Sequence, residues 1–393
     1  MSHHFDISAA NEDISDVMCF AGPSDDDGPR TVIGMNASPQ DLPSLPIFHD
    51  HIEHPWDPAA FYELKLDLNN DFVEDITWRF TFPVDPSTHT QYVQVAQLNG
   101  ADATNRNASG TIITPPNARV GEVLCVGDGI KIFAGVRLDP FFTDIRIPAT
   151  LRNVLPPGSG VNPDPELDTL APFKNTFQGQ TTRLAMVELP ATITGLDPIQ
   201  CWGSVAIPGD GPGSWCQVQR AAGADVAVVF GNGQDPYHGM INGSEPSTDL
   251  AGKPDPGSLW GMIRDQVATV VQAMGTYQDG KNGQPTPQAY GAFVADTLLP
   301  DVLPFTPGTT ALWDPWNGVK NGKGLTEELA SNFAKMVTNT DFTSKLTQHT
   351  QIRDHFPYLA HPRTTDRRDR CQPAHDRRNT SRVPPGGAAA AFA

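Results

Sequence analysis

Residues 61–82 read FYELKLDLNNDFVEDITWRFTF, and this stretch decides the fold class. Residues 61–68 alternate between charged or polar and apolar side chains, and in residues 76–82 Ile, Trp and Phe alternate with Thr and Arg. A period of two residues is typical of a β-strand with one buried face. The sequence therefore predicts a hairpin of two strands joined by an acidic loop.

The loop of this hairpin carries oxygen-bearing side chains at positions one, three, five and nine: Asp67, Asn69, Asp71 and Asp75. Ca²⁺ takes six to eight oxygen ligands, and this spacing resembles the start of an EF-hand-type loop. Phe72 stands where such loops place glycine, and Trp78 stands where they place a bidentate glutamate. Two interpretations stay open: a Ca²⁺ site, or an acidic turn held by Asx hydrogen bonds.

Strand-like patterns continue on both sides of the hairpin. The apolar runs 122–126 and 130–136 are joined by Gly-Asp-Gly, which favours a second hairpin. Further strand-like stretches are 31–36, 92–98, 111–114, 181–189, 199–207 and 215–220. About nine or ten short strands separated by turn residues predict a mainly β fold, a large antiparallel β-sandwich or barrel-like body.

The hydrophobic period changes in the C-terminal third. Residues 259–274 carry apolar side chains three and four residues apart, which predicts an amphipathic helix. Residues 289–299 form a second candidate helix, and Thr326-Glu327-Glu328 opens a third. We therefore expect one β-rich domain over residues 1–360, with C-terminal helices from about 256 to 347 packed on it, and a disordered or aberrant tail over 361–393.

The net charge of the chain restricts which classes of molecule can be its binding partners. The 393 residues carry a formal net charge of −18, so the surface repels the phosphates of nucleic acids and anionic lipids. Residues 363–382 are the exception, with seven Arg against three Asp. A small-molecule ligand is the expected partner; the oligomeric state is left open.

The cysteines and the lack of long apolar runs indicate in which compartment of the cell the protein is expected. The five cysteines include no C-x-x-C pair, which argues against a disulfide framework or a zinc ribbon. The N-terminus lacks the pattern of a secretory signal, and no run of about eighteen apolar residues exists. These observations predict a soluble cytoplasmic protein without a membrane span.

Three groups of residues are candidates for chemistry. The first is His3, Asp13 and Asp16, which could bind Mg²⁺ or a transition metal or act as a general base, or could form a solvated N-terminus. The second is Arg137, Asp139 and Asp144, which could fix an anionic substrate or form a structural ion pair. The third is His49, His51 and His54, a metal-ligand pattern or an exposed His-rich loop.

Several short pieces lie in a distinctive order along the chain: SH at 2–3, DISDVMCF at 13–20, YELKLD at 62–67, EDIT at 74–77, FAGVRLDPFFTD at 133–144, WCQVQR at 215–220, LPDVLP at 299–304 and NGKGLTEE at 321–328. In this order they resemble the bacterial domain-of-unknown-function family 4331. Members of that family often begin with a secretory signal, which this chain lacks, and the segment after Arg220 also differs. The resemblance implies a β-rich fold and brings no settled reaction.

Familiar nucleotide and hydrolase motifs are absent: the sequence contains no G-x-G-x-x-G behind a strand, P-loop, G-x-S-x-G or H-E-x-x-H. We therefore expect no nucleotide cofactor. Two hypotheses follow. One is a small-molecule enzyme of bacterial metabolism with a His/Asp site assisted by a divalent metal. The other is a non-catalytic β-rich binding or structural protein stabilised by Ca²⁺ at the hairpin loop.

Overall fold

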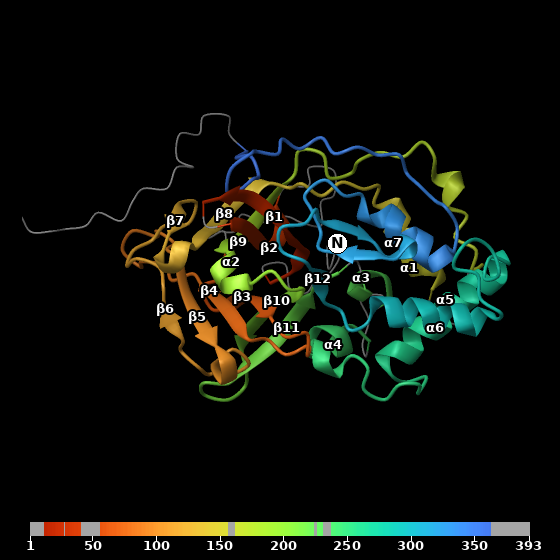
Figure 1. The fold of residues 1–393 in the computed structure, drawn as a ribbon, viewed down its shortest axis with the longest axis horizontal. Coiled ribbons are helices and arrows are strands. Elements are labelled where there is room, and N and C mark those ends of the chain that lie inside the picture. Colours follow the sequence, from red (N-terminus) through yellow and green to blue (C-terminus); the bar gives the residue numbers. More distant parts are fainter. Residues whose placement is uncertain are drawn as a thin grey trace, which may run out of the picture.

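The computed structural model describes residues 12–26, 28–40, 56–155, 162–223, 226–230 and 237–362. Within these residues the fold is mainly β, as predicted, with two large antiparallel sheets and a set of helices gathered at one end of the molecule (Figure 1). The basic tail and the three histidines of the 39–60 loop lie outside the described residues.

Two sheets form the body. Sheet A has the order β1 (Ile14–Asp25), β2 (Gly28–Gln40), β9 (Thr181–Pro190), β8 (Lys131–Leu138) and β7 (Val123–Cys125). Sheet B has the order β11 (Trp215–Ala221), β10 (Ile199–Pro208), β3 (Phe61–Asp67), β4 (Ile76–Thr81), β5 (Gln94–Asn99) and β6 (Thr111–Ile112), and β12 (Leu303–Phe305) pairs with β10. A small separate sheet contains β13 (Leu312–Asp314) and β14 (Val319–Asn321).

Helices lie between strands along the chain and after the last strand. They are α1 (Arg146–Val154), α2 (Ala191–Thr194), α3 (Val226–Phe230), α4 (Tyr237–Asn242), α5 (Leu259–Met274), α6 (Pro287–Leu298) and α7 (Leu329–Thr338). The bounds of α5 agree with the predicted helix 259–274, and the hydroxyl of Ser258 accepts from the amide of Gly261 as its N-cap. The sequence patterns did not predict α1, α3 or α4.

The main core lies between the sheets and continues into the helices. Tyr62, Leu64 and Leu66 of β3 pack on the same core as Val17 of β1 and the helical residue Ile263. One continuous apolar cluster therefore joins the β body to the C-terminal helices. No described helix has the length and apolar character needed to cross a membrane.

The β3 strand differs from its predicted half-buried character. Both of its faces are buried, because Glu63, Lys65 and Asp67 are only 1%, 2% and 0% exposed. The outward face of sheet B is covered by the 100–110 loop, whose carbonyl oxygens bind the guanidinium of Arg79. Alternation of charged and apolar residues usually indicates a solvated face; here it marks a buried polar one.

The outward face of sheet A is also covered. A second apolar cluster joins Met18, Phe133 and Met186 of sheet A to Phe356 and Leu359 of the C-terminal segment. The amide of Leu138 donates to the carbonyl of Ala360 at 2.8 Å, which fixes this segment across the sheet. Burial on both faces explains how charged side chains of both sheets come to lie inside the protein.

Candidate functional site

Sheet A brings two of the predicted catalytic carboxylates onto one face. Asp16 of β1 lies opposite Asn36 of β2 in the strand register. The side-chain amide of Asn36 donates to Asp139 Oδ1 at 3.4 Å. Asp16 and Asp139, which are far apart in the sequence, are therefore both neighbours of Asn36, one through the strand register and the other through a hydrogen bond.

Lys323 lies beside Asp16 and was not predicted. Its ammonium forms a buried ion pair with Asp16, and its backbone bridges to Cys19 of β1. Burial lowers the pKa of Lys323 to about 7, although the charge of Glu327 opposes this shift. Gly322, which precedes the lysine, has a φ of 69°, and a Cβ there would overlap the carbonyl oxygen of Cys19, so only glycine lets the chain approach β1 this closely.

Asp139 is a fully buried carboxylate. Burial raises its pKa to about 7, while the amide of Phe141, which donates to Oδ1 at 2.9 Å, opposes the shift. Its Oδ2 has no hydrogen-bond partner among the described residues. A carboxyl group of this kind can exchange a proton near neutral pH, but none of the described pockets is lined by Asp139, Asp16 or Lys323.

Arg137 lies on β8, two residues before Asp139. Its guanidinium carbon is 4.0 Å from the centre of the Phe133 ring, and one of its nitrogens donates to the carbonyl of Val136 at 3.0 Å. The side chain is 1% exposed. A stacked, buried guanidinium suits a structural role, because an anionic ligand would have to reach it through the covering C-terminal segment.

Asp144 belongs to a different group from Arg137. It forms a two-point ion pair with Arg146, with distances of 2.8 and 2.5 Å, and it accepts from the amide of Lys174 at 2.9 Å. Although burial raises the pKa of Asp144, these partners leave it below its usual value. The interaction fixes the turn that leads into α1.

Some predicted site residues cannot be placed together. Asp13 is buried at the start of β1, whereas His3 lies outside the described residues. His49, His51 and His54 are also outside them. The joint site of His3 with Asp13 and Asp16, and the three-histidine site, stay predictions.

The hairpin loop is held by hydrogen bonds to its own carboxylates. Asp67 Oδ1 accepts from the amides of Asn69 and Asn70 at 3.0 and 2.7 Å, and Oδ2 accepts from the amide of Phe72 at 2.8 Å. Asn70 and Phe72 adopt left-handed φ values of 63° and 66°. Phe72 thus takes the conformation that glycine usually supplies at this position.

The rest of the loop repeats this arrangement. Asp71 Oδ1 accepts from the amide of Val73 at 3.0 Å, and Asp75 Oδ2 accepts from the amide of Leu68 at 2.8 Å. Across the described part of the chain, no three His, Cys, Asp or Glu side chains are grouped closely enough to hold a metal ion. These contacts are those of the Asx-bonded turn, and Ca²⁺ binding here stays a hypothesis.

A buried ion network lies under the hairpin on the outward face of β3. Lys65 Nζ is 2.5 Å from Glu74, 3.6 Å from Glu63 and 3.8 Å from Glu245. Although burial lowers the pKa of Lys65, these three carboxylates raise it above its usual value. Arg79 Nε also donates to Glu63 at 2.8 Å.

Arg106 closes the network from the covering loop. It pairs with Glu245 and donates to Gln217 Oε1 at 2.7 Å. The network therefore contains three cations and three carboxylates: Lys65, Arg79 and Arg106 with Glu63, Glu74 and Glu245. This balance of charge indicates a structural network rather than a site that awaits a charged ligand.

A second buried ion pair joins the body to the helical end. Arg220 of β11 binds both oxygens of Asp249, at 3.1 and 2.6 Å, and donates to the carbonyl of Ile241 at 3.1 Å. Asp301 accepts from the amide of Gly223 at 2.9 Å. Burial raises the pKa of Asp301 to about 6, with the nearby charge of Arg220 opposing the shift.

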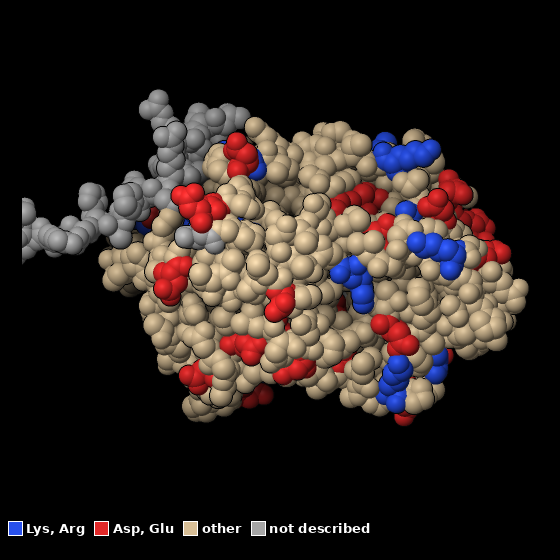
Figure 2. Space-filling view, in the orientation of Figure 1, with Lys and Arg blue, Asp and Glu red and all other residues tan. Residues whose placement is uncertain are grey.

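The helical end also contains an open acidic pocket of about 420 Å³. Its lining includes four carboxylates, Asp164, Glu166, Asp168 and Asp341, and no Lys, Arg or His. Apolar contact is offered by Leu167, Met274 and Phe342. In the view of Figure 2, the helical end carries acidic side chains together with several Lys and Arg side chains.

Comparison with known proteins adds no relative. No protein-family model matches the chain, no curated protein matches it, and no solved structure matches it. The resemblance to the domain-of-unknown-function family 4331 therefore stays a hypothesis that rests on the short pieces of sequence alone.

Proposed function

We propose that the chain is a non-catalytic β-rich binding protein whose acidic pocket binds a small organic cation. The observation that carries the proposal is the lining of that pocket, in which every charged side chain is acidic. Asp341 has Lys335 as an ion-pair partner at 3.6 Å, but no Lys, Arg or His lines the pocket itself, so excess negative charge and an accessible cavity coincide there.

The backbone adds to the negative potential of the pocket. Two helices end at its wall, α5 at Met274 and α7 at Thr338. The two ends are tied together, because the hydroxyl of Thr276 donates to the carbonyl of Thr338 at 2.6 Å. A helix C-terminus carries a partial negative charge, so both ends favour a cation.

The apolar residues of the pocket indicate which chemical group the ligand carries besides its cation. A cavity of a few hundred Å³ is the usual size for a small molecule. Among the lining residues, Leu167 and Phe342 are buried, whereas Glu166 and Asp168 are exposed. The pocket therefore suits an ammonium group attached to a hydrocarbon or aromatic part.

Isothermal titration calorimetry with benzyltrimethylammonium tests the proposal, with benzyl alcohol as the uncharged comparison. In water, a carboxylate at roughly 6 Å from a cation contributes about 0.7 kcal/mol, which is a factor of about three in affinity. The double variant Glu166→Gln/Asp168→Asn should therefore bind about ten-fold more weakly, and added salt should weaken the wild type in the same direction.

The matched control is Asp197→Asn, which removes an exposed carboxylate that does not line the pocket. It should bind the probe as the wild type does. Equal affinity of the wild type for the cation and the alcohol would refute the proposal, and so would equal losses in the control and the double variant.

A metal-assisted enzyme is the second candidate, and one observation favours it. Asp139 and Lys323 are both buried, and both have pKa values moved to about 7; such shifts are frequent at catalytic sites. Elemental analysis of the purified protein tests it, because stoichiometric Zn, Fe, Cu or Mn would support an enzyme. Stoichiometric Ca²⁺ alone would instead support a cation at the hairpin loop.

A further inference from the structure

Two cysteines lie inside the main core, one on each sheet. Cys19 of β1 and Cys201 of β10 are both free and both 0% exposed. Cys125 is disulfide-bonded, and Cys216 is free and exposed. Neither buried thiol takes part in the pocket or the ion networks.

The strand geometry places the two cysteines opposite each other. A Cβ built on Gly203 of β10 would lie 3.3 Å from Val17 Cγ2 of β1 and 3.3 Å from Met35 Sδ. The absence of a side chain at Gly203 therefore lets β1 and β10 approach closely at this point. Sheets usually pack about 10 Å apart, which is too far for a disulfide, whose Cα atoms lie about 4.4–6.8 Å apart.

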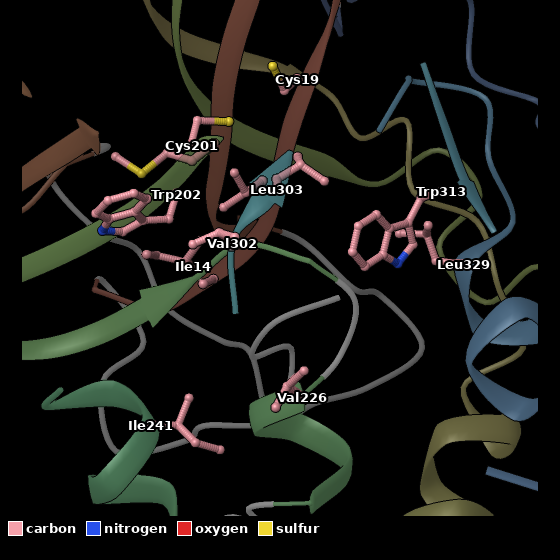
Figure 3. Packing of buried hydrophobic residues seen from close by; sticks show 14 of the residues in the cluster. Ile14, Cys19, Cys201, Trp202, Val226, Ile241, Val302, Leu303, Trp313 and Leu329 are labelled. Atoms are coloured by element: carbon pink, nitrogen blue, oxygen red, sulfur yellow. The ribbon is translucent and has the colours of Figure 1, made fainter. Parts of the chain in front are cut away.

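The cysteines are the next inward-facing residues on both strands. Two residues after Val17 is Cys19, and two residues before Gly203 is Cys201. The inward direction of Cys201 follows from its register with Leu66, as that of Gly203 follows from its register with Leu64. Both cysteines belong to the same core cluster, as Figure 3 shows.

We propose that Cys19 and Cys201 form a disulfide that joins sheet A to sheet B. The oxidant is a small-molecule disulfide such as oxidised glutathione. One cysteine thiolate attacks it, releases one reduced thiol and forms a mixed disulfide. The second cysteine attacks the mixed disulfide and releases the other reduced thiol. The two cysteines thus lose two electrons and two protons, and the oxidant becomes two thiols.

The timing of this reaction follows from burial. Burial raises the pKa of the Cys19 thiol well above its usual value, so little thiolate forms once the core has closed. Both residues also have no contact with solvent. The disulfide therefore forms while the sheets are still coming together, and the folded core then protects it from reductants.

Peptide mapping of the full-length protein tests the proposal. The protein is unfolded with reductant, refolded with oxidised and reduced glutathione, and checked by circular dichroism for its β-sheet signal. Free thiols are then blocked with N-ethylmaleimide in denaturant, and the protein is digested without reduction. The expected product joins the peptides that contain Cys19 and Cys201. Refolded protein in which both cysteines carry the blocking group overturns the proposal.

Thermal unfolding gives an independent measurement. The oxidised protein should melt about 5 °C higher than the same protein kept in reductant, because a cross-link over so long a loop restricts the unfolded chain. The control Cys216→Ser should retain this difference, because it removes only the exposed thiol. In Cys201→Ser the difference should shrink, leaving only what the bond at Cys125 contributes. An unchanged difference in Cys201→Ser would overturn the proposal.

Discussion

Replacement of Lys65 by methionine should destabilise the protein strongly. Methionine fits the space of the lysine stem, so the change removes the charge with little loss of packing. Lys65 is 2% exposed and is the ion-pair partner of Glu74, which is 5% exposed. Breaking a buried pair by removing one partner costs about 3–5 kcal/mol, because the other charge stays buried without compensation. We expect a loss of unfolding free energy in that range.

The double variant Lys65→Met/Glu74→Met separates charge from packing. It removes both members of the closest pair, so no carboxylate is left without a partner at position 74. Buried ion pairs replaced by apolar side chains are often neutral or even stabilising. The double variant should therefore be more stable than Lys65→Met alone, although Glu63 and Glu245 also lose a neighbouring cation.

The dependence on pH provides a further check. Burial raises the pKa of Glu74 above 4.5, and Lys65 opposes this shift. A carboxyl group whose folded pKa is raised loses stability as pH rises from its unfolded value through its folded value. Without Lys65 the folded pKa rises further. The stability difference between Lys65→Met and the wild type should therefore be small near pH 4.5 and grow toward pH 7.

Urea unfolding at several pH values, followed by tryptophan fluorescence, measures these differences. The control is Lys253→Met, which removes a lysine that is 36% exposed and pairs with Asp296, itself 53% exposed. It should cost about 1 kcal/mol or less. A loss below about 1 kcal/mol for Lys65→Met, or a double variant less stable than the single one, would contradict the reasoning.

Two further predictions concern other parts of the fold. Ser258→Ala removes the N-cap hydroxyl of α5 and should cost about 1 kcal/mol in urea unfolding; a loss below about 0.3 kcal/mol would mean that the cap is dispensable. Asp301→Asn should flatten the pH dependence of stability. With a folded pKa of about 6 against 3.8, Asp301 stabilises the wild type fully at low pH, and about 3 kcal/mol is lost as pH rises through 6. Identical pH profiles for the variant and the wild type would contradict this.

Local patterns predicted the elements whose signals lie within a few residues. The helix at 259–274 has apolar residues at helical spacing and a serine cap, and both features act within one segment. The strands of the first hairpin, at 61–67 and 76–81, also agree with the predicted ranges to within one residue. In each case the residues that decide the structure are close together in the chain.

The sequence could not predict which polar faces are buried. The charged face of β3 looks like a solvated face, and the loop at 100–110 together with Glu245, which lies far along the chain, converts it into an interior network. The same holds for Lys323, which meets Asp16 only because the chain returns to β1 after more than 300 residues. The acidic pocket likewise combines residues 164–169 with 338–342. Such sites depend on tertiary contacts that no local period reports.

The two proposals, cation binding in the acidic pocket and a Cys19–Cys201 disulfide, are independent of each other. The acidic pocket and the Cys19–Cys201 pair share no residue, so either can fail without the other. The proposed disulfide, like the bond at Cys125, bears on the expected cytoplasmic location, because disulfides form and persist mainly in oxidising compartments. If mapping finds Cys19 joined to Cys201 in protein isolated from its natural source, the chain folds in an oxidising environment. The expectation of a cytoplasmic protein, which rests on the N-terminal sequence, would then have to be given up.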